Sequence, residues 1–149
     1  MKALSTEELT AASEAVITGV VEDMEAQWST DGKTIFTRAY IRITQTVRGR
    51  LNQQIVLVEY EGGEVGGIGL RVSDVAPLEK GENVLLYLKN AKVKGNGKAY
   101  NIVGKAQGHY SIGKDGIARK RGFSVIDGQT GVDNDMPLED IIKKIRSIR

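Results

Sequence analysis

His109 is the only histidine in the sequence and the side chain best suited to acid–base chemistry. Histidine exchanges a proton near neutral pH and can serve as a general base. Such a base needs a nucleophile to activate, but neither a G-x-S-x-G nor an H-E-x-x-H motif occurs. We therefore predict no catalytic residue and no enzyme, and interpret His109 as exposed or hydrogen-bonded. A hydrolase with His109 as its base is the alternative.

The sequence contains no cysteine. Thiol catalysis, disulfide frameworks, iron–sulfur clusters and zinc fingers are thereby excluded. Oxygen ligands for calcium occur near the C-terminus, at Asp127, Asp133, Asn134 and Asp135. Their spacing does not fit an EF-hand loop, and a polar linker explains them equally well. We predict no metal site and no cofactor.

Residues 108–114 come close to a phosphate-binding loop, because Gly108 is followed by four residues and then by Gly113 and Lys114. The motif requires Ser or Thr next, but Asp115 stands there, and its carboxylate would repel a phosphate. No helix is predicted to follow, so no helix dipole would favour an anion. We interpret the segment as a hairpin.

The segment 62–69, with the sequence GGEVGGIG, is the most unusual stretch of the chain. Its amides could hold an anion or a partner's strand. Alternatively, the glycines could serve the geometry of a bulged crossover at the rim of a barrel. The predicted binding residues are Gly62, Gly63, Glu64, Gly66, Gly67 and Arg71, joined by Gln107 and His109 if the barrel brings those strands close.

A second surface could bind single-stranded nucleic acid. Aromatic and cationic side chains alternate on one face of a predicted strand, at Phe36, Arg38, Tyr40 and Arg42. OB-folds use such surfaces to stack bases and to track phosphates. The net charge of only +2 and the presence of only two phenylalanines weigh against this alternative.

Charge is unevenly distributed along the chain. Residues 1–31 carry seven acids and one lysine, whereas residues 89–122 carry nine bases and one acid. Such asymmetry can mark a polyanion-binding face. We interpret the basic part as a solvated, lysine-rich hairpin.

The elements that would position these residues can be read from the hydrophobic pattern. Ser5 and Glu8 have the spacing of a capping box, which predicts a short helix over residues 6–13. Extended segments follow at residues 15–28 and 34–47, separated by a turn at residues 29–33. Two successive strands of this length favour a curved sheet that closes into a barrel.

Further strands are predicted later in the chain. Residues 83–88 are apolar on both faces, as expected for a central strand. Alternation over residues 100–112 predicts one strand with Gln107 and His109 on its polar face. The other predicted strands are residues 54–61 and 117–120, and a second hairpin turn is predicted at residues 94–98.

The chain is predicted to form a single domain over residues 1–149. A barrel core at about residues 15–122 would be followed by a polar linker at 123–136 and an amphipathic helix at 137–149 that begins with Pro137. The predicted fold class is therefore all-β. We expect an OB-like closed β-barrel with a short N-terminal helix and an amphipathic C-terminal helix.

Two phrases of the sequence resemble the netrin and tissue-inhibitor-like branch of OB-folds. They are Ala15-Val16-Ile17-Thr18-Gly19-Val20-Val21 and the strand end Thr46-Val47-Arg48-Gly49. The chain lacks the cysteines that define those modules, so the resemblance implies their fold and not their inhibitory function.

Three other phrases resemble an uncharacterised set of small exported prokaryotic proteins. They are GGEVGGIG at 62–69, Pro77 with GENVLLYL at 81–88, and GKAQG at 104–108. This resemblance implies export to the cell surface or beyond with a leader removed; a cytoplasmic location is the alternative.

No apolar run is long enough to span a bilayer. We expect a monomeric, non-catalytic binding or protein-interaction module outside the cytoplasm, whose partner is another protein or a cell-surface polymer.

Overall fold

The computed structural model describes residues 3–72, 75–91, 99–121 and 135–148. Two long antiparallel strands, β1 (Ala15–Trp28) and β2 (Ile35–Arg48), form the centre of the fold. Every second residue of β2 from Ile35 to Ile41 is buried, which confirms the predicted alternation. In the turn between the strands, Asp31 accepts a hydrogen bond from the Lys33 amide.

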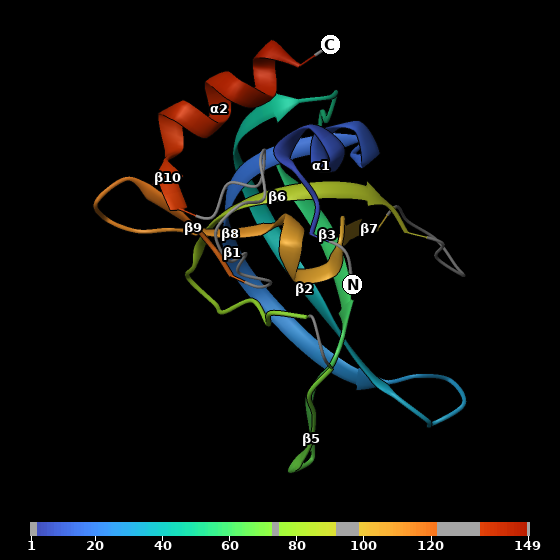
Figure 1. Ribbon diagram of the computed structural model, residues 1–149. Helices are drawn as coiled ribbons and strands as arrows, with labels where there is room; N and C mark the ends of the chain where they lie inside the picture. Colours follow the sequence, from blue (N-terminus) through green and yellow to red (C-terminus); the bar gives the residue numbers. More distant parts are fainter. Residues whose placement is uncertain (1–2, 73–74, 92–98, 122–134, 149) are drawn as a thin grey trace.

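Strand β1 closes the sheet on itself because it pairs with two neighbours. One is β2, and the other is β6 (Asn83–Asn90). The order β1-β2-β3-β7-β6-β1 makes a closed five-stranded barrel, in which β3 (Ile55–Glu61) runs parallel to β7 (Tyr100–Ile102). This arrangement confirms the predicted OB-like, all-β fold (Figure 1).

Two hydrophobic cores lie on the two sides of β6. Its residues Val84, Leu86 and Leu88 face the barrel interior, whereas Leu85 and Tyr87 face a second core. This explains why residues 84–88 are all fully buried, as the sequence predicted.

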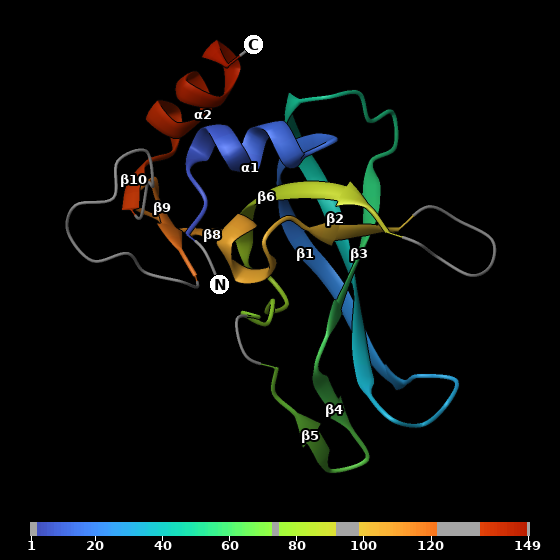
Figure 2. The same cartoon turned by 45° about the vertical axis from the view of Figure 1, so that its right-hand side comes forward.

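The second core is covered by the two helices, which lie together at one end of the molecule (Figures 1 and 2). Helix α1 (Thr6–Ala12) begins with the predicted capping box of Ser5 and Glu8. Helix α2 (Leu138–Ser147) buries Ile141, Ile142 and Ile145. No helix in the part of the chain that the structure describes is long and apolar enough to cross a membrane.

The C-terminal boundaries differ from those predicted. Pro137 is the N-cap of α2 rather than its first helical residue, and the helix ends at Ser147 rather than at 149. Strand β10 (Asp135–Pro137) pairs with β9 (Ile117–Lys120), so the last residues of the predicted linker belong to the sheet. The rest of that linker, and the predicted turn at 94–98, lie outside the described residues.

The predicted single strand over residues 100–112 is wrong. The structure has strand β7, then the 3-10 helix η1 (Lys105–Gly108), and then strand β8 (His109–Ile112), which pairs with β6. The chain turns at Gly104 and Lys105, both of which have positive φ angles, 65° and 55°. Consequently residues 106–110 are buried on every side rather than on alternate sides.

The glycine-rich segment forms a β-hairpin rather than a bulged crossover. Strands β4 (Gly63–Val65) and β5 (Ile68–Leu70) pair in a sheet of their own. Gly66 and Gly67 have φ angles of 57° and 82°, which a two-residue hairpin turn of type I′ requires at both central positions. The hairpin projects from the end of the barrel opposite the helices (Figures 1 and 2).

Candidate functional site

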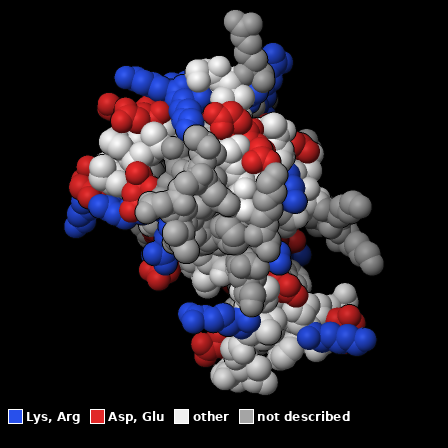
Figure 3. All heavy atoms as spheres, viewed as in Figure 1, with Lys and Arg blue, Asp and Glu red and all other residues white. Residues whose placement is uncertain are grey.

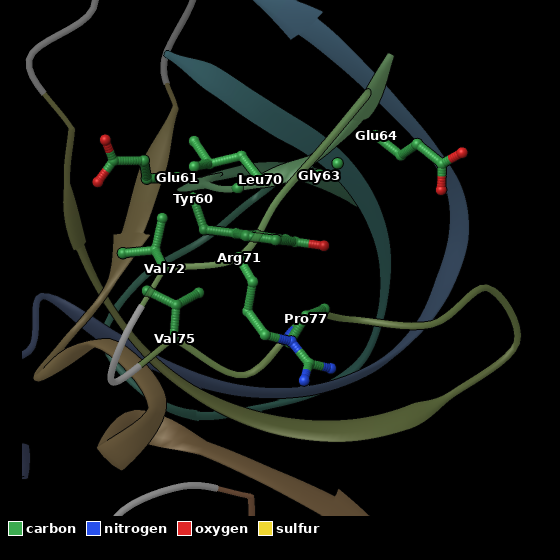
Figure 4. Close-up of a pocket in the computed structure, with 11 residues that line it drawn as sticks. Tyr60, Glu61, Gly63, Glu64, Leu70, Arg71, Val72, Val75 and Pro77 are labelled. Carbon is green, nitrogen blue, oxygen red and sulfur yellow. The ribbon is translucent and has the colours of Figure 1, made fainter. Parts of the chain in front are cut away.

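A cavity of about 430 Å³ lies where the glycine-rich hairpin leaves the barrel. Its larger apolar lining residues are Tyr60, Leu70, Val72, Val75 and Pro77. Arg71 also lines this cavity, and its side chain runs toward Pro77 (Figure 4). The carboxylates of Glu61 and Glu64 point outward from the centre in the same view (Figure 4).

Close packing fixes the base of the hairpin against the barrel. The Thr37 hydroxyl donates a hydrogen bond of 2.8 Å to the Gly62 carbonyl. A β-carbon on Gly63 would lie 2.5 Å from the Thr37 hydroxyl oxygen, and Gly63 has a φ angle of 133°. Glycine is therefore required at position 63 both for space and for backbone conformation.

A second cavity, of about 420 Å³, lies between β3 and β7. These two strands pair only at Val58 and Tyr100, and beyond that pair β3 continues to Glu61. Tyr60, Glu61 and Val75 line this cavity as well as the first. We call the two adjoining cavities the rim groove.

Tyr60 forms part of the floor of the rim groove. Its hydroxyl accepts a hydrogen bond of 3.1 Å from the Leu78 amide. Burial raises the pKa of Tyr60 above its ordinary value of 10.0, so the phenol stays neutral at physiological pH. Tyr60 can therefore offer an apolar ring and a neutral hydroxyl to a ligand, but no charge.

The acidic and basic residues of the groove differ in how they are paired. Glu59 forms an ion pair of 2.9 Å with Arg38, and Glu61 accepts a hydrogen bond of 3.0 Å from the Thr34 hydroxyl. The three cations that line the groove have no ion pair and no hydrogen bond to any side chain or backbone group among the described residues. They are Arg71, Lys89 and Lys105.

Of the eight predicted binding residues, four line the groove together: Gly62, Gly63, Glu64 and Arg71. Gly66 and Gly67 lie at the tip of the hairpin, where no atom approaches the position of an added β-carbon within 4 Å. The remaining two, Gln107 and His109, are buried in the fold and line neither cavity.

Gln107 and His109 hold other segments in place. The Gln107 side-chain oxygen accepts a hydrogen bond of 2.6 Å from the Leu4 amide. The imidazole of His109 contacts the Glu82 carboxylate at 2.8 Å through Nε2 and the Ala76 carbonyl at 3.3 Å through Nδ1. His109 thus holds both ends of the segment 76–82 through hydrogen bonds, and Ala76 is part of the groove wall.

Glu82 is held in its charged form by this contact. Burial alone would raise the pKa of its carboxyl, but the hydrogen bond and the charge of His109 outweigh burial and lower the pKa below 4.5. The Glu79 amide adds a hydrogen bond of 3.0 Å to the same carboxylate. The His109 imidazole has no exposed surface, and the Ser111 hydroxyl bonds to the Glu82 carboxylate, so the His109–Glu82 pair is an internal support.

Several groove residues carried no signal in the sequence. Tyr60 alternates with the buried residues Val56 and Val58, so its pattern is that of a core residue. Val75 and Pro77 lie in a segment without periodicity, and Lys105 was placed on a strand. Only the glycine-rich composition of 62–69 marked this part of the molecule.

The predicted nucleic-acid face is present on the outside of β2, but its cations are paired. Arg38 stacks over Phe36, with its guanidinium carbon 5.5 Å from the ring centroid, and also binds Glu59. Arg42 forms an ion pair with Glu22. On the face that Figure 3 shows, basic and acidic side chains are interspersed. Paired cations attract phosphates weakly, because a carboxylate already neutralises each of them.

Among the described residues, no three His, Asp or Glu side chains gather as a metal-binding group. Comparison of the sequence with models of protein families found no match, and comparison with curated proteins found no significantly similar chain. The function is therefore inferred from the geometry of the rim groove.

Proposed function

We propose that the protein is a non-catalytic binding module that holds an extended segment of a partner protein in the rim groove. The observation that carries this proposal is the edge of β3 beyond Val58, which has no strand partner among the described residues and lies beside two adjoining cavities. Val58 is the last residue of β3 that pairs with β7, and three further residues of β3 border the second cavity: Glu59, Tyr60 and Glu61.

Backbone groups along this edge are directed into the groove. The Gly62 amide bonds to the Ile35 carbonyl of β2, and successive residues of a strand point their backbone groups to opposite sides. The backbone amide and carbonyl groups of Glu59 and Glu61 therefore point away from β2. The Asn101 side chain donates a hydrogen bond of 3.0 Å to the Glu59 carbonyl, in the place of a strand partner. The backbone of Glu61 is then available to an added strand, a common mode of peptide recognition.

The cavities on either side of this edge suit a peptide's side chains. Peptides that add to a sheet gain affinity from main-chain hydrogen bonds and specificity from pockets that take alternate side chains. Tyr60 and Val75 lie where the two cavities meet, and they would contact a central apolar side chain. The exposed hairpin forms one wall of the groove and takes no part in barrel closure, so its position is explained by a binding role.

The non-catalytic part of the proposal is supported by the state of His109. Its two ring nitrogens are engaged by Glu82 and by the Ala76 carbonyl, and the side chain has no exposed surface. A general base must reach the proton that it abstracts. A substrate would have to displace the protein core to meet this imidazole.

A peptide library displayed on phage would test the proposal. Octapeptides selected on the wild-type protein should lose at least about ten-fold in affinity for Val75→Arg, because a cation would fill the junction of the cavities. Ile55→Arg is the matched control, since Ile55 is exposed at the other end of β3. Equal affinity for all three proteins would overturn the site.

Chemical modification of the peptide tests strand addition without altering the protein. N-methylation of alternate amides removes the hydrogen bonds of one edge of an extended peptide. One register of methylation should abolish binding, whereas the other register should leave it nearly unchanged. Equal effects of both registers would contradict the strand-addition mode. Binding of cell-wall polysaccharide in place of every peptide would favour a surface polymer as the partner.

Single-stranded nucleic acid is the alternative ligand, and its proposed surface is the outer face of β2. Binding through Arg38 and Arg42 would fall steeply as salt increases. We expect no such binding by an oligothymidine, because Glu59 and Glu22 already neutralise these arginines. Salt-sensitive binding that is lost in Arg38→Gln and Arg42→Gln would establish the alternative.

An extracytoplasmic, monomeric state completes the proposal. The extracytoplasmic location is supported by the resemblance of segments 62–69, 81–88 and 104–108 to exported proteins. Fractionation of the source cells would test the location, and light scattering would test the mass against 16.2 kDa. Recovery of the protein with the cytosol would contradict the location. A mass of twice this value would contradict the monomeric state.

A further inference from the structure

The rim groove combines an apolar floor with an excess of available positive charge. Tyr60 and Val75 form the floor at the junction of the cavities. Arg71 stands on one side of this junction, in the first cavity, while Lys89 and Lys105 stand in the second. All three cations are exposed.

The acids of the groove do not neutralise these cations within the described residues. The Glu59 carboxylate binds Arg38, which lies outside both cavities, and Glu61 accepts its hydrogen bond from Thr34. The Glu64 carboxylate points outward from the first cavity (Figure 4). A ligand that enters the groove therefore meets cations whose charge is not already matched by an ion pair in this part of the structure.

The backbone around Lys105 places one of these cations at the groove wall. Gly104 and Lys105 both have left-handed conformations, with φ angles of 65° and 55°. Residues other than Gly, Asn and Asp rarely adopt this backbone conformation. Where they do, they are concentrated at functional sites. The turn leaves Lys105 exposed while Ala106 and Gln107, the next two residues, are buried.

We infer that the rim groove selects an acidic peptide, in which carboxylate side chains flank an apolar residue. This inference rests on the proposed function and gives it a ligand class. The apolar side chain would contact Tyr60 and Val75, and the carboxylates would reach Arg71 at one end and Lys105 and Lys89 at the other. Complementary charge would speed association and exclude basic segments.

A nucleic acid or another dense polyanion fits the groove less well. Glu61 lines the second cavity, its carboxylate bonds only to the neutral Thr34 hydroxyl among the described residues, and it would repel a ligand with a negative charge at every unit. Tyr60 is half-buried and is the one aromatic residue that lines the two cavities in the described part of the chain, so successive bases have no row of rings on which to stack. A peptide can place its acids at the cations and its apolar residues between them.

Fluorescence anisotropy with three sets of labelled octapeptides would test the inference. Each set has a central valine, and the positions two residues before and two residues after it carry glutamate, glutamine or lysine, because alternate side chains of an extended peptide share one face. The wild-type protein should prefer the glutamate set, with an affinity that falls as salt increases. Arg71→Gln and Lys105→Gln should each weaken binding of the glutamate set about three-fold, and the double variant about ten-fold.

Two further variants make the result specific to the groove. Lys143→Gln removes an exposed cation from α2, at the opposite end of the molecule, and should leave the affinity unchanged. Arg71→Glu combined with Lys105→Glu should reverse the preference toward the lysine set. All substituted side chains are exposed, so these variants should fold as the wild type does, which circular dichroism would verify.

The outcomes separate this inference from the proposed function. Equal binding of all three peptide sets, with loss in Val75→Arg, would overturn the acidic preference and keep the groove as a peptide site. Binding that Val75→Arg leaves unchanged would overturn both. Tighter binding of an oligothymidine than of the glutamate set, weakened by Arg71→Gln, would replace the acidic peptide with nucleic acid.

Discussion

His109 and Glu82 form a contact of 2.8 Å at a place where the histidine has no exposed surface. The contact joins β8 to the segment that leads into β6, and through Ala76 it reaches the wall of the rim groove. Both ring nitrogens lie within hydrogen-bond distance of an oxygen atom. The geometry of the groove thus depends on a buried, charge-assisted interaction.

Glu82→Gln should lower the free energy of unfolding by about 2 kcal/mol near neutral pH, because it removes a charge-assisted hydrogen bond from a buried partner. Folding lowers the pKa of Glu82 below 4.5. The stabilisation is therefore present above that pH and is lost as pH falls through the folded-state pKa. Urea unfolding at about pH 7 and in acid would show the difference between wild type and variant shrinking in acid.

The exposed neighbour Glu79 provides the control for this prediction. Glu79→Gln removes the same charge from the same turn, while the Glu79 amide can still bind Glu82. It should change the stability by less than about 0.5 kcal/mol. An equal loss in both variants would show that net charge, and not the contact with His109, explains the effect.

Arg48 holds the C-terminal end of α2 against the barrel. Its Nη1 donates hydrogen bonds to the carbonyl oxygens of Ile148, at 2.5 Å, and Ile145, at 3.5 Å. The Ile145 carbonyl also accepts a hydrogen bond of 3.2 Å from the Ile148 amide, and a cation at this end of the helix interacts favourably with the helix dipole. Arg48→Gln should cost about 1 kcal/mol of stability.

Hydrogen exchange would locate the effect of Arg48→Gln. Amides in the last turn of α2 should lose protection before those of β6, because the helix end frays independently of the barrel. Arg146→Gln, which removes an exposed cation from the same helix, is the control and should leave both sets of amides unchanged. Uniform loss of protection would contradict a local role for Arg48.

Asp115 and Arg119 form a bidentate ion pair across the turn between β8 and β9, with distances of 2.6 and 3.1 Å. The Arg119 hydrogen bond and the Ile117 amide lower the pKa of Asp115 to about 2. Carboxyl-detected NMR titration should find this value, and Arg119→Gln should move the pKa toward 3.8. An unchanged value in the variant would show that the Ile117 amide alone sets it.

Much of the fold could be predicted because its strands have one or two buried faces. The alternation in β2 and the continuous apolar run in β6 each reflect a local relation between sequence and environment. Over residues 100–112 the alternation predicted one strand, whereas the structure has two strands separated by a 3-10 helix. The polar residues Gln107 and His109 are buried because Leu4 and Glu82, which are remote in sequence, supply their hydrogen bonds.

The candidate site was less predictable than the barrel. Glycine content pointed to residues 62–69, since glycine marks positions where the backbone must turn or approach closely. The other wall of the groove depends on where β3 separates from β7 and where residues 75–77 lie across the barrel rim. These are long-range packing relations, and no periodicity in the sequence encodes them.

The glycine at position 63 allows the most direct test of how the groove is built. Gly63→Ala should destabilise the protein by about 2 kcal/mol, because its β-carbon would overlap the Thr37 hydroxyl and its φ angle of 133° disfavours alanine. Gly69→Ala, in the same hairpin, meets no atom within 4 Å and should be nearly neutral. Urea unfolding of both variants measures the difference. If Gly63→Ala were equally neutral, the hairpin would not be anchored through Thr37, and this wall of the groove would lack the rigidity that peptide binding requires.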